Sequence, residues 1–190
     1  MGEAEKNESI RTNKTQRQSF FGRILVWLGL FSLLTLIFIG LLRSQQGPVA
    51  IGKEAPDFSL VSFDGEEFTL SELRGKVIVL NFWASWCKPC EQEAVDLENA
   101  WQLYQERGDI VFLGVAWTDT EDKSLSYLER FGITFPNGPD LGTRISQAYR
   151  ITGVPETYII DRSGNLAFVK LSPFISVDEI RMAIDPLLKE

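Results

Sequence analysis

Residues 77–90 read VIVLNFWASWCKPC, and this stretch decides the fold class. Its first half, 77–83, is apolar without alternation, which is typical of a strand buried on both faces of a sheet. A second run of this kind, IVFLGVAW at 110–117, follows a segment whose apolar residues recur at helical spacing. A strand, a helix and another strand in this order predict a parallel pair within an α/β domain.

The two cysteines of the chain, Cys87 and Cys90, lie where the strand at 77–83 passes into that helix. Unpaired N–H groups and the dipole at a helix N-terminus favour a thiolate, so Cys87 is the predicted nucleophile. Two intervening residues bring the second sulfur back within bonding reach. Cys90 is therefore predicted to attack a mixed disulfide at Cys87 and release the product. Pro89 suits the first helical turn because no N–H donor is needed there.

A lone C-x-x-C pair has two other interpretations, half of a zinc site and a structural disulfide. The chain has no histidine and no third cysteine, so zinc would need carboxylates or a second chain. A disulfide that closes so short a loop constrains little of the unfolded chain. We therefore favour a redox role and expect neither a metal nor a cofactor.

Shorter elements are predicted on both sides of this central unit. Asp64-Gly65 and the turn at 162–165 have the composition of hairpin turns. Ser176 and Glu179 form a capping box that opens the last helix, which Pro186 is expected to shorten. The expected elements are, in order, a hairpin at 58–60 and 67–70, helices at 123–131 and 143–149, strands at 157–161 and 166–170, and the helix after Ser176.

Three motifs carry a family resemblance: APDFSL at 55–60, GKVIVLNFWASWCKPCEQE at 75–93 and GVPETYIID at 153–161. They resemble, in the same order, motifs of the thioredoxin superfamily, and more narrowly of its membrane-anchored TlpA/ResA/DsbE-like thiol-disulfide oxidoreductases of the cytochrome c maturation type. The resemblance implies a thioredoxin-like fold, with a central mixed sheet flanked by helices and an N-terminal β-hairpin extension.

Further site residues are implied by this resemblance. Pro155 is expected to be cis and to face the two sulfurs, and with Val154 it offers backbone groups to an extended substrate. Trp86 is expected either at the rim of the site or packed beside it. Glu93 and Glu156 match acidic positions of the same group, and each is a candidate to take a proton from the resolving thiol.

The neighbours of the dithiol modify its predicted chemistry. Cytosolic thioredoxins carry a buried acid where Asn81 stands, and an amide cannot shuttle a proton, so that task passes to a glutamate or to water. Lys88 is expected to lower the pKa of Cys87 while nearby acids raise it. Trp83 is expected in the core.

An uncharged apolar run, ILVWLGLFSLLTLIFIGLL, occupies residues 24–42. At a rise of ~1.5 Å per residue, a helix of this length crosses a hydrocarbon core of ~30 Å. We therefore divide the chain into a cytoplasmic tail (1–23), a transmembrane anchor (24–42), a linker (43–52) and a thioredoxin-like domain (53–190). The alternatives are a cleaved signal peptide, a lipoprotein signal and a buried core helix. The run exceeds a typical signal-peptide core of ~7–15 residues, and no cysteine precedes Cys87 to take a lipid after the run.

Charge is distributed unevenly along the chain. Residues 1–43 carry six Lys or Arg against three Glu, a net +3, whereas residues 44–190 carry thirteen against twenty-three acids, a net −10. The positive-inside rule then puts the N-terminus in the cytoplasm and the domain on the outer side of the cell membrane. Nucleic acid is not an expected partner, because phosphate binding needs clustered cations.

The function expected from the resemblance is the reduction of protein disulfides, such as that of apocytochrome c, with electrons from an integral-membrane thiol donor. A thiol peroxidase is one alternative, because peroxiredoxins also show APDFSL. Asn81, however, stands where the proline of their P-x-x-x-[ST]-x-x-C pattern belongs. A copper-binding chaperone is another alternative, but those relatives add a histidine, which this chain lacks.

Overall fold

The structure is a computed structural model that describes residues 25–40 and 49–189. Residues 25–40 are helical with exposed side chains, and residues 49–189 belong to a separate compact unit. No helix within these two described ranges has both the length and the apolar character needed to cross a membrane. The expected anchor at 24–42 extends past the described helix at both ends, and the expected tail at 1–23 lies outside the described residues.

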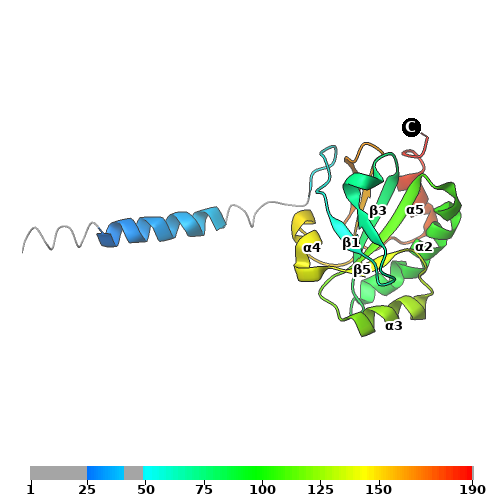
Figure 1. Cartoon of the computed structure of the whole chain (residues 1–190), viewed down its shortest axis with the longest axis horizontal. Helices are drawn as coiled ribbons and strands as arrows, with labels where there is room; N and C mark the ends of the chain where they lie inside the picture. Colours follow the sequence, from blue (N-terminus) through cyan, green and yellow to red (C-terminus); the bar gives the residue numbers. More distant parts are fainter. Residues whose placement is uncertain (1–24, 41–48, 190) are drawn as a thin grey trace, which may run out of the picture. The chain divides into compact units, whose positions relative to one another are not determined.

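A five-stranded mixed sheet forms the centre of the compact unit, with the strand order β5-β4-β3-β6-β7 (Figure 1). β3 and β4 run parallel, as do β4 and β5, whereas β6 is antiparallel to both β3 and β7. The bounds are β3 Val77–Trp83, β4 Ile110–Ala116, β5 Asn137–Pro139, β6 Glu156–Ile160 and β7 Leu166–Lys170. The predicted α/β class and the parallel central pair are therefore confirmed.

β3 is the middle strand of the sheet, a position in which both faces of a strand are covered. All seven residues are buried, and successive side chains point to opposite faces. Ile78 and Leu80 join one hydrophobic cluster, while Val77 and Val79 join a second cluster on the other face. The apolar run without alternation in the sequence thus reflects two cores that share one strand.

Helices cover both faces of the sheet. α4 packs on the face of Ile78, and α2 and α5 pack on the face of Val77, so they lie on opposite sides of the sheet (Figure 1). α5 is capped by Ser176, whose hydroxyl accepts from Glu179 N, and it ends before Pro186, as predicted. The helix bounds are α2 Lys88–Tyr104, α3 Glu121–Phe131, α4 Arg144–Tyr149 and α5 Val177–Ile184, with short 3-10 turns η1 Leu70–Leu73, η2 Gln105–Arg107 and η3 Leu141–Thr143.

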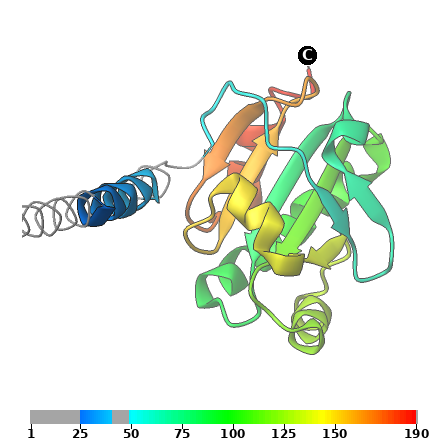
Figure 2. The same ribbon diagram turned by 60° about the vertical axis from the view of Figure 1, so that its left-hand side comes forward.

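The predicted N-terminal hairpin is present as a separate two-stranded sheet, β1 (Ser59–Val61) and β2 (Glu67–Thr69) (Figure 2). It lies against β5, since Phe63 N donates to the carbonyl of Asn137 at 2.7 Å. A Cβ on Gly138 would stand 2.2 Å from the carbonyl oxygen of Val61, so this contact requires glycine.

Two features differ from the expectation or add to it. β5 was not predicted, because its three residues, Asn-Gly-Pro, carry no hydrophobic pattern. Gly52, the last residue of the expected linker at 43–52, donates its N–H to the carbonyl of Leu166 at 2.7 Å. The chain therefore joins the sheet region before the expected start of the domain at residue 53.

Candidate active site

The two cysteines lie at the junction of β3 and α2, as the sequence predicts. Cys87 is the N-cap of α2, and its Sγ accepts a hydrogen bond from the backbone N–H of Cys90 at 3.1 Å. The two sulfurs form a disulfide with a Cα–Cα distance of 5.3 Å. Pro89 occupies the first turn. The helix N-terminus thus provides a donor to Cys87 that stabilises its thiolate in the reduced protein.

The loop before β6 faces the dithiol. The Val154–Pro155 peptide bond is cis, as the resemblance implies. The carbonyl oxygen of Val154 lies 3.4 Å from Cys87 Sγ, which is within hydrogen-bonding reach of a thiol at that position. The predicted meeting of this loop with the sulfurs is therefore confirmed, while the substrate-binding role of Val154 and Pro155 stays a prediction.

Glu93 is buried beside Cys90, with only 1% of its surface exposed. Its carboxylate accepts from Asn81 Nδ2 at 2.8 Å and from Phe174 N at 2.9 Å. Burial raises the pKa of Glu93 to about 7, although the two hydrogen bonds oppose this shift. A carboxyl group with this pKa can both accept and donate a proton near neutral pH.

A small cavity connects Glu93 to the resolving thiol. Asn81, Cys90, Glu93 and Tyr127 are among its lining residues, and it leaves about 10 Å³ for the centre of a water molecule. That volume is at the lower limit for one ordered water. Glu93 and Cys90 therefore border the same small cavity, which has room for one bridging water.

Glu156 has different surroundings, although it is also buried at 4% exposure. Its Oε1 accepts from Thr152 N, Thr152 Oγ1 and Gly153 N, and its Oε2 accepts from the Tyr158 hydroxyl at 2.8 Å. All these donors belong to the loop that carries Pro155 or to β6. Glu156 therefore fixes this loop, and its role as a proton acceptor stays a prediction.

The two tryptophans of the motif separate into a core residue and a rim residue. Trp83 is 3% exposed, stacks on Tyr127 at 4.5 Å between ring centroids, and donates to Asn137 Oδ1 at 2.7 Å. Trp86 is 56% exposed and donates to the carbonyl of Thr118 at 3.3 Å. The predicted core position of Trp83 is confirmed, and Trp86 takes the rim position of its two alternatives.

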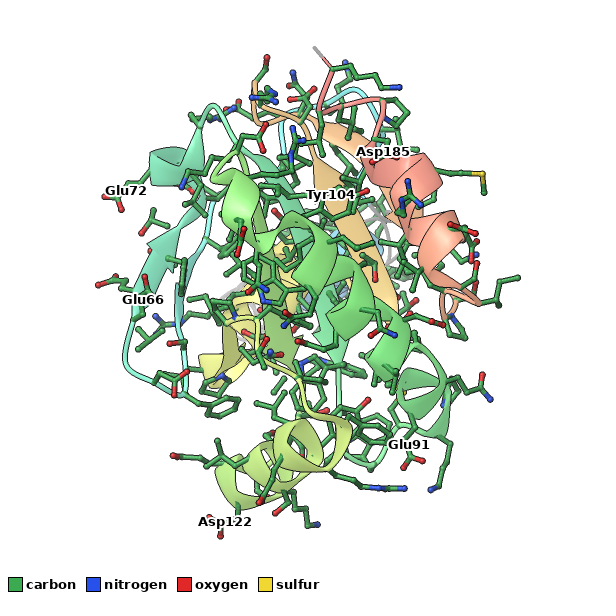
Figure 3. The ribbon with its side chains drawn as sticks, turned by 90° about the vertical axis from the view of Figure 1, so that its right-hand side faces the viewer. Glu66, Glu72, Glu91, Tyr104, Asp122 and Asp185 are labelled. Carbon is green, nitrogen blue, oxygen red and sulfur yellow. A yellow bond between two sulfur atoms is a disulfide. The ribbon has the colours of Figure 1, made fainter. Side chains whose placement is uncertain are left out.

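Lys88 is largely exposed and forms an ion pair with Glu91, one turn further along α2. Its Nζ lies 3.0 Å from Glu91 Oε1, at the N-terminal end of α2. Glu91 points toward the side of α2 that faces α3 (Figure 3). Its carboxylate offsets part of the positive charge that Lys88 brings to the predicted nucleophile.

Asp119 is a site residue that sequence reasoning missed. Its carboxylate accepts from Ser85 N at 2.6 Å and from Ser85 Oγ at 2.9 Å, which holds the turn before Cys87. Thr118, next to it, has a left-handed φ of 47° and accepts from Trp86. The segment after β4 therefore holds the segment after β3 through these hydrogen bonds. The predicted parallel pairing of the two strands could have indicated this contact, because it brings their carboxyl ends to the same edge of the sheet.

Together these elements give a pair of sulfurs at a helix N-terminus, an opposing cis-proline loop and a buried carboxyl group whose pKa, about 7, lies near neutral pH. Such a site exchanges a dithiol for a disulfide, with both electrons held by the sulfurs themselves. The fold and the site define the class: this is a thioredoxin-like thiol-disulfide oxidoreductase.

Comparison with known proteins agrees with this class. Residues 51–169 match the model of the AhpC/TSA family. The thiol-disulfide oxidoreductase ResA of Geobacillus thermodenitrificans is 37% identical over 123 residues, which are 65% of this chain and 70% of that protein. The thiol:disulfide interchange protein HelX of Rhodobacter capsulatus is 36% identical over 145 residues, covering 74% and 79% of the two chains.

A solved structure shows the same fold. The crystal structure of a thiol:disulfide interchange protein of the thioredoxin family from Chlorobium tepidum TLS has a TM-score of 0.66 and 29% sequence identity, and it covers 75% of this chain and 99% of its own. The chain belongs to the AhpC/TSA family. The resemblance to ResA- and DsbE-like thiol-disulfide oxidoreductases is therefore confirmed, as is the thioredoxin-like fold, while the membrane anchoring of that group stays a prediction for this chain.

Proposed function

We propose that this chain is a membrane-tethered oxidoreductase on the extracytoplasmic side that reduces protein disulfides, among them that of apocytochrome c. One observation carries the chemical part of this proposal. Cys87 Sγ lies at the N-cap of α2 with a backbone donor at 3.1 Å, and it faces the cis-proline loop at 3.4 Å. The names of ResA and HelX support disulfide exchange as the reaction class.

The reaction that fits this geometry has two exchange steps. The Cys87 thiolate attacks one sulfur of the substrate disulfide, forms a mixed disulfide and expels the other substrate sulfur as a thiolate. Cys90 then loses its proton and attacks Cys87 Sγ, which releases the second substrate thiolate and leaves the Cys87–Cys90 disulfide. Two electrons pass from the enzyme to the substrate, and protons from the medium complete the two substrate thiols.

Glu93 is the proposed acceptor of the Cys90 proton, because it shares the small cavity with that sulfur. Its pKa of about 7, raised by burial, makes the carboxylate a stronger base than an exposed glutamate. After the second step the proton leaves through the same cavity.

Trapping of a mixed disulfide tests the proposal directly. In Cys90→Ser the second step is blocked, so a substrate protein should remain bound to Cys87 through a bond that a reductant cleaves. Cys87→Ser is the matched control, since it keeps one thiol and should trap nothing. Equal trapping by both variants would remove Cys87 from the role of nucleophile.

The direction of exchange is tested by the midpoint potential of the Cys87–Cys90 couple. A value near that of thioredoxin, about −270 mV, fits a reductant that is recharged by a membrane dithiol, whereas a value near about −120 mV fits an oxidant. We expect the lower value. We also propose that an integral-membrane thiol protein supplies the two electrons that restore the reduced state.

The location is supported by the charge asymmetry and by the apolar run at 24–42, which together favour an anchored domain outside the cytoplasm. Both cysteines of the chain lie in that domain, so thiol labelling reports its side. After mild reduction of intact cells, a membrane-impermeant maleimide should label the full-length protein. Labelling only after lysis would place the domain in the cytoplasm.

Peroxide consumption distinguishes the main alternative. Asn81, where peroxiredoxins carry a proline, is held by hydrogen bonds to Glu93 and Thr157 and lies in the strand. We expect residues 44–190, once reduced, to consume peroxide slowly and to reduce a protein disulfide rapidly. The reverse order of rates would favour a thiol peroxidase.

A further inference from the structure

An open pocket of about 400 Å³ lies beside the dithiol, between the turn that precedes α2 and the helix α3. It is separate from the small cavity at Glu93, and the exchange chemistry does not use it. Its lining residues are Ser85, Trp86, Lys123, Ser126, Tyr127 and Arg130.

The position of the pocket ties it to the nucleophile. Ser85 and Trp86 directly precede Cys87 in the chain and form one wall. Tyr127, on the opposite wall, belongs to the buried cluster that contains both cysteines. A polypeptide whose sulfur meets Cys87 can therefore place a neighbouring residue in this pocket.

The charge of the pocket is opposite to that of the domain. Lys123 and Arg130 are its charged lining residues, while residues 44–190 carry a net −10. Lys123 forms no ion pair within the described ranges 25–40 and 49–189. Arg130 lies 3.3 Å from Glu91 through one guanidinium nitrogen, which leaves further N–H donors. The charged residues that line the pocket are therefore both positive, although the domain as a whole is acidic.

Three acids near the pocket are bound by other groups or point away from α2. Glu91 is bound by both Lys88 and Arg130, and Asp119 is bound by the backbone and hydroxyl of Ser85. Asp122, on α3, points away from α2 (Figure 3). The lining residues of the pocket thus include two cations and no carboxylate, and Glu91, which pairs with Arg130, is not one of them.

We propose that this pocket is a specificity subsite that binds an acidic side chain lying within a few residues of the target cysteine in the substrate polypeptide. This inference rests on the proposed reduction of protein disulfides. The guanidinium of Arg130 and the ammonium of Lys123 contact the substrate carboxylate, and the exposed ring of Trp86 packs against the adjoining chain. The rest of the acidic domain repels the same carboxylate. Charge therefore selects substrates whose acidic residue lies at the position that reaches the pocket.

Paired disulfide peptides test this subsite with the full-length protein in its reduced form. The peptides share one sequence and carry Glu, Gln or Lys at the same positions flanking the cysteine. We expect kcat/KM for the Glu peptide to exceed that for the Lys peptide roughly tenfold at low salt. The preference should shrink at high salt, because exposed charges are screened.

Charge reversal identifies the residues. Lys123→Glu/Arg130→Glu should invert the preference so that the Lys peptide is reduced faster, while Lys123→Gln/Arg130→Gln should abolish it. The matched control is Lys53→Glu/Lys76→Glu, which changes the net charge by the same amount outside the pocket and should keep the preference for Glu. Unchanged reduction of the Gln peptide by all variants shows that their dithiol is intact.

The outcomes separate the two proposals. If the native chain reduces the Glu and Lys peptides equally well at low salt, or if the charge-reversed variant keeps the native preference, the subsite is wrong and the proposed function stands. If the native chain reduces none of the peptides and no protein disulfide, the proposed function fails as well.

Discussion

The surroundings of Glu93 and of Glu156 differ, although both carboxyl groups are buried near the same dithiol. Glu93, in the second turn of α2, receives two hydrogen bonds, from Asn81 and from the backbone of Phe174. Glu156, the first residue of β6 and next to the cis proline, receives four, from Thr152, Gly153 and Tyr158. Burial alone therefore does not determine whether a glutamate transfers protons or stabilises a loop.

The number and origin of the donors explain the difference. Around Glu93 the loss of water outweighs the hydrogen bonds, and its pKa is raised to about 7. Around Glu156 the donors come from the segment that the carboxylate organises, as in a cap or turn. Glu93 is thus suited to proton transfer and Glu156 to holding the loop.

The largest expected effect is that of Glu156→Ala. The substitution leaves the backbone N–H groups of Thr152 and Gly153 without their acceptor and removes the nearer of two acceptors of the Tyr158 hydroxyl. It should lower the free energy of unfolding by about 4 kcal/mol. Urea unfolding measures this change. Glu129→Ala, on the exposed surface of α3, is the control and should change stability by no more than about 0.5 kcal/mol.

If Glu156→Ala proves as stable as the control, the loop does not depend on this carboxylate and Glu156 does not have the structural role assigned to it. Glu156→Gln tests the role in proton transfer separately. Its amide keeps one acceptor oxygen, so this variant should retain the pH profile of disulfide exchange. Loss of that profile would give Glu156 the proton-transfer role instead.

The second expected effect is a pH dependence of stability that belongs to Glu93. Because its pKa rises from 4.5 to about 7 on folding, the folded protein keeps a proton that the unfolded chain releases in this interval. The contribution of this group is fully present below pH 4.5 and is lost as the pH rises to 7, by about 3 kcal/mol. Glu93→Gln should remove this slope from the urea unfolding free energy. If the unfolding free energies of the native chain and of Glu93→Gln depend on pH in the same way, the pKa of Glu93 is not raised in the folded protein.

The same substitution should alter the chemistry. In the native chain, the rate of the second exchange step should rise with an inflection near pH 7, as Glu93 becomes a base. Glu93→Gln should slow that step and lose the inflection, while alkylation of Cys87 in the reduced protein changes little. An inflection that survives the substitution would assign it to another group.

The smallest of the three expected effects is that of Asp119→Ala. Ser85 loses the acceptor for its backbone N–H and its hydroxyl, which should lower the free energy of unfolding by about 2 kcal/mol. The turn before Cys87 then becomes less ordered, so the alkylation rate of Cys87 should change too. Asp119→Asn keeps one acceptor oxygen and should recover about half of the stability. A native alkylation rate in Asp119→Ala would limit Asp119 to a local structural role.

Several elements of the fold were predictable from short-range patterns. Residues 77–83 and 166–170 match β3 and β7 in full, because burial on both faces, or a hairpin turn before the strand, leaves a clear signal. The capping box at Ser176 gave the start of α5. β5 was missed because its three residues, Asn-Gly-Pro, carry no hydrophobic pattern and become a strand only by pairing with the distant β4. No local pattern encodes that pairing.

The chemical identity of the site could be inferred from short stretches of the chain. The spacing of Cys87 and Cys90 at a strand-to-helix junction places both sulfurs within one turn, and the three motifs predicted the opposing cis proline. These features depend on contacts between residues that are close in the chain or on a motif that contains them.

Only the tertiary structure decided what the polar groups around the sulfurs do. It separated Glu93 from Glu156, brought Asp119 to Ser85, and set Lys123 and Arg130 beside Trp86. The charge state and reactivity of a buried or clustered group depend on the donors, charges and water that surround it. Those neighbours come from distant parts of the chain, and only folding brings them together.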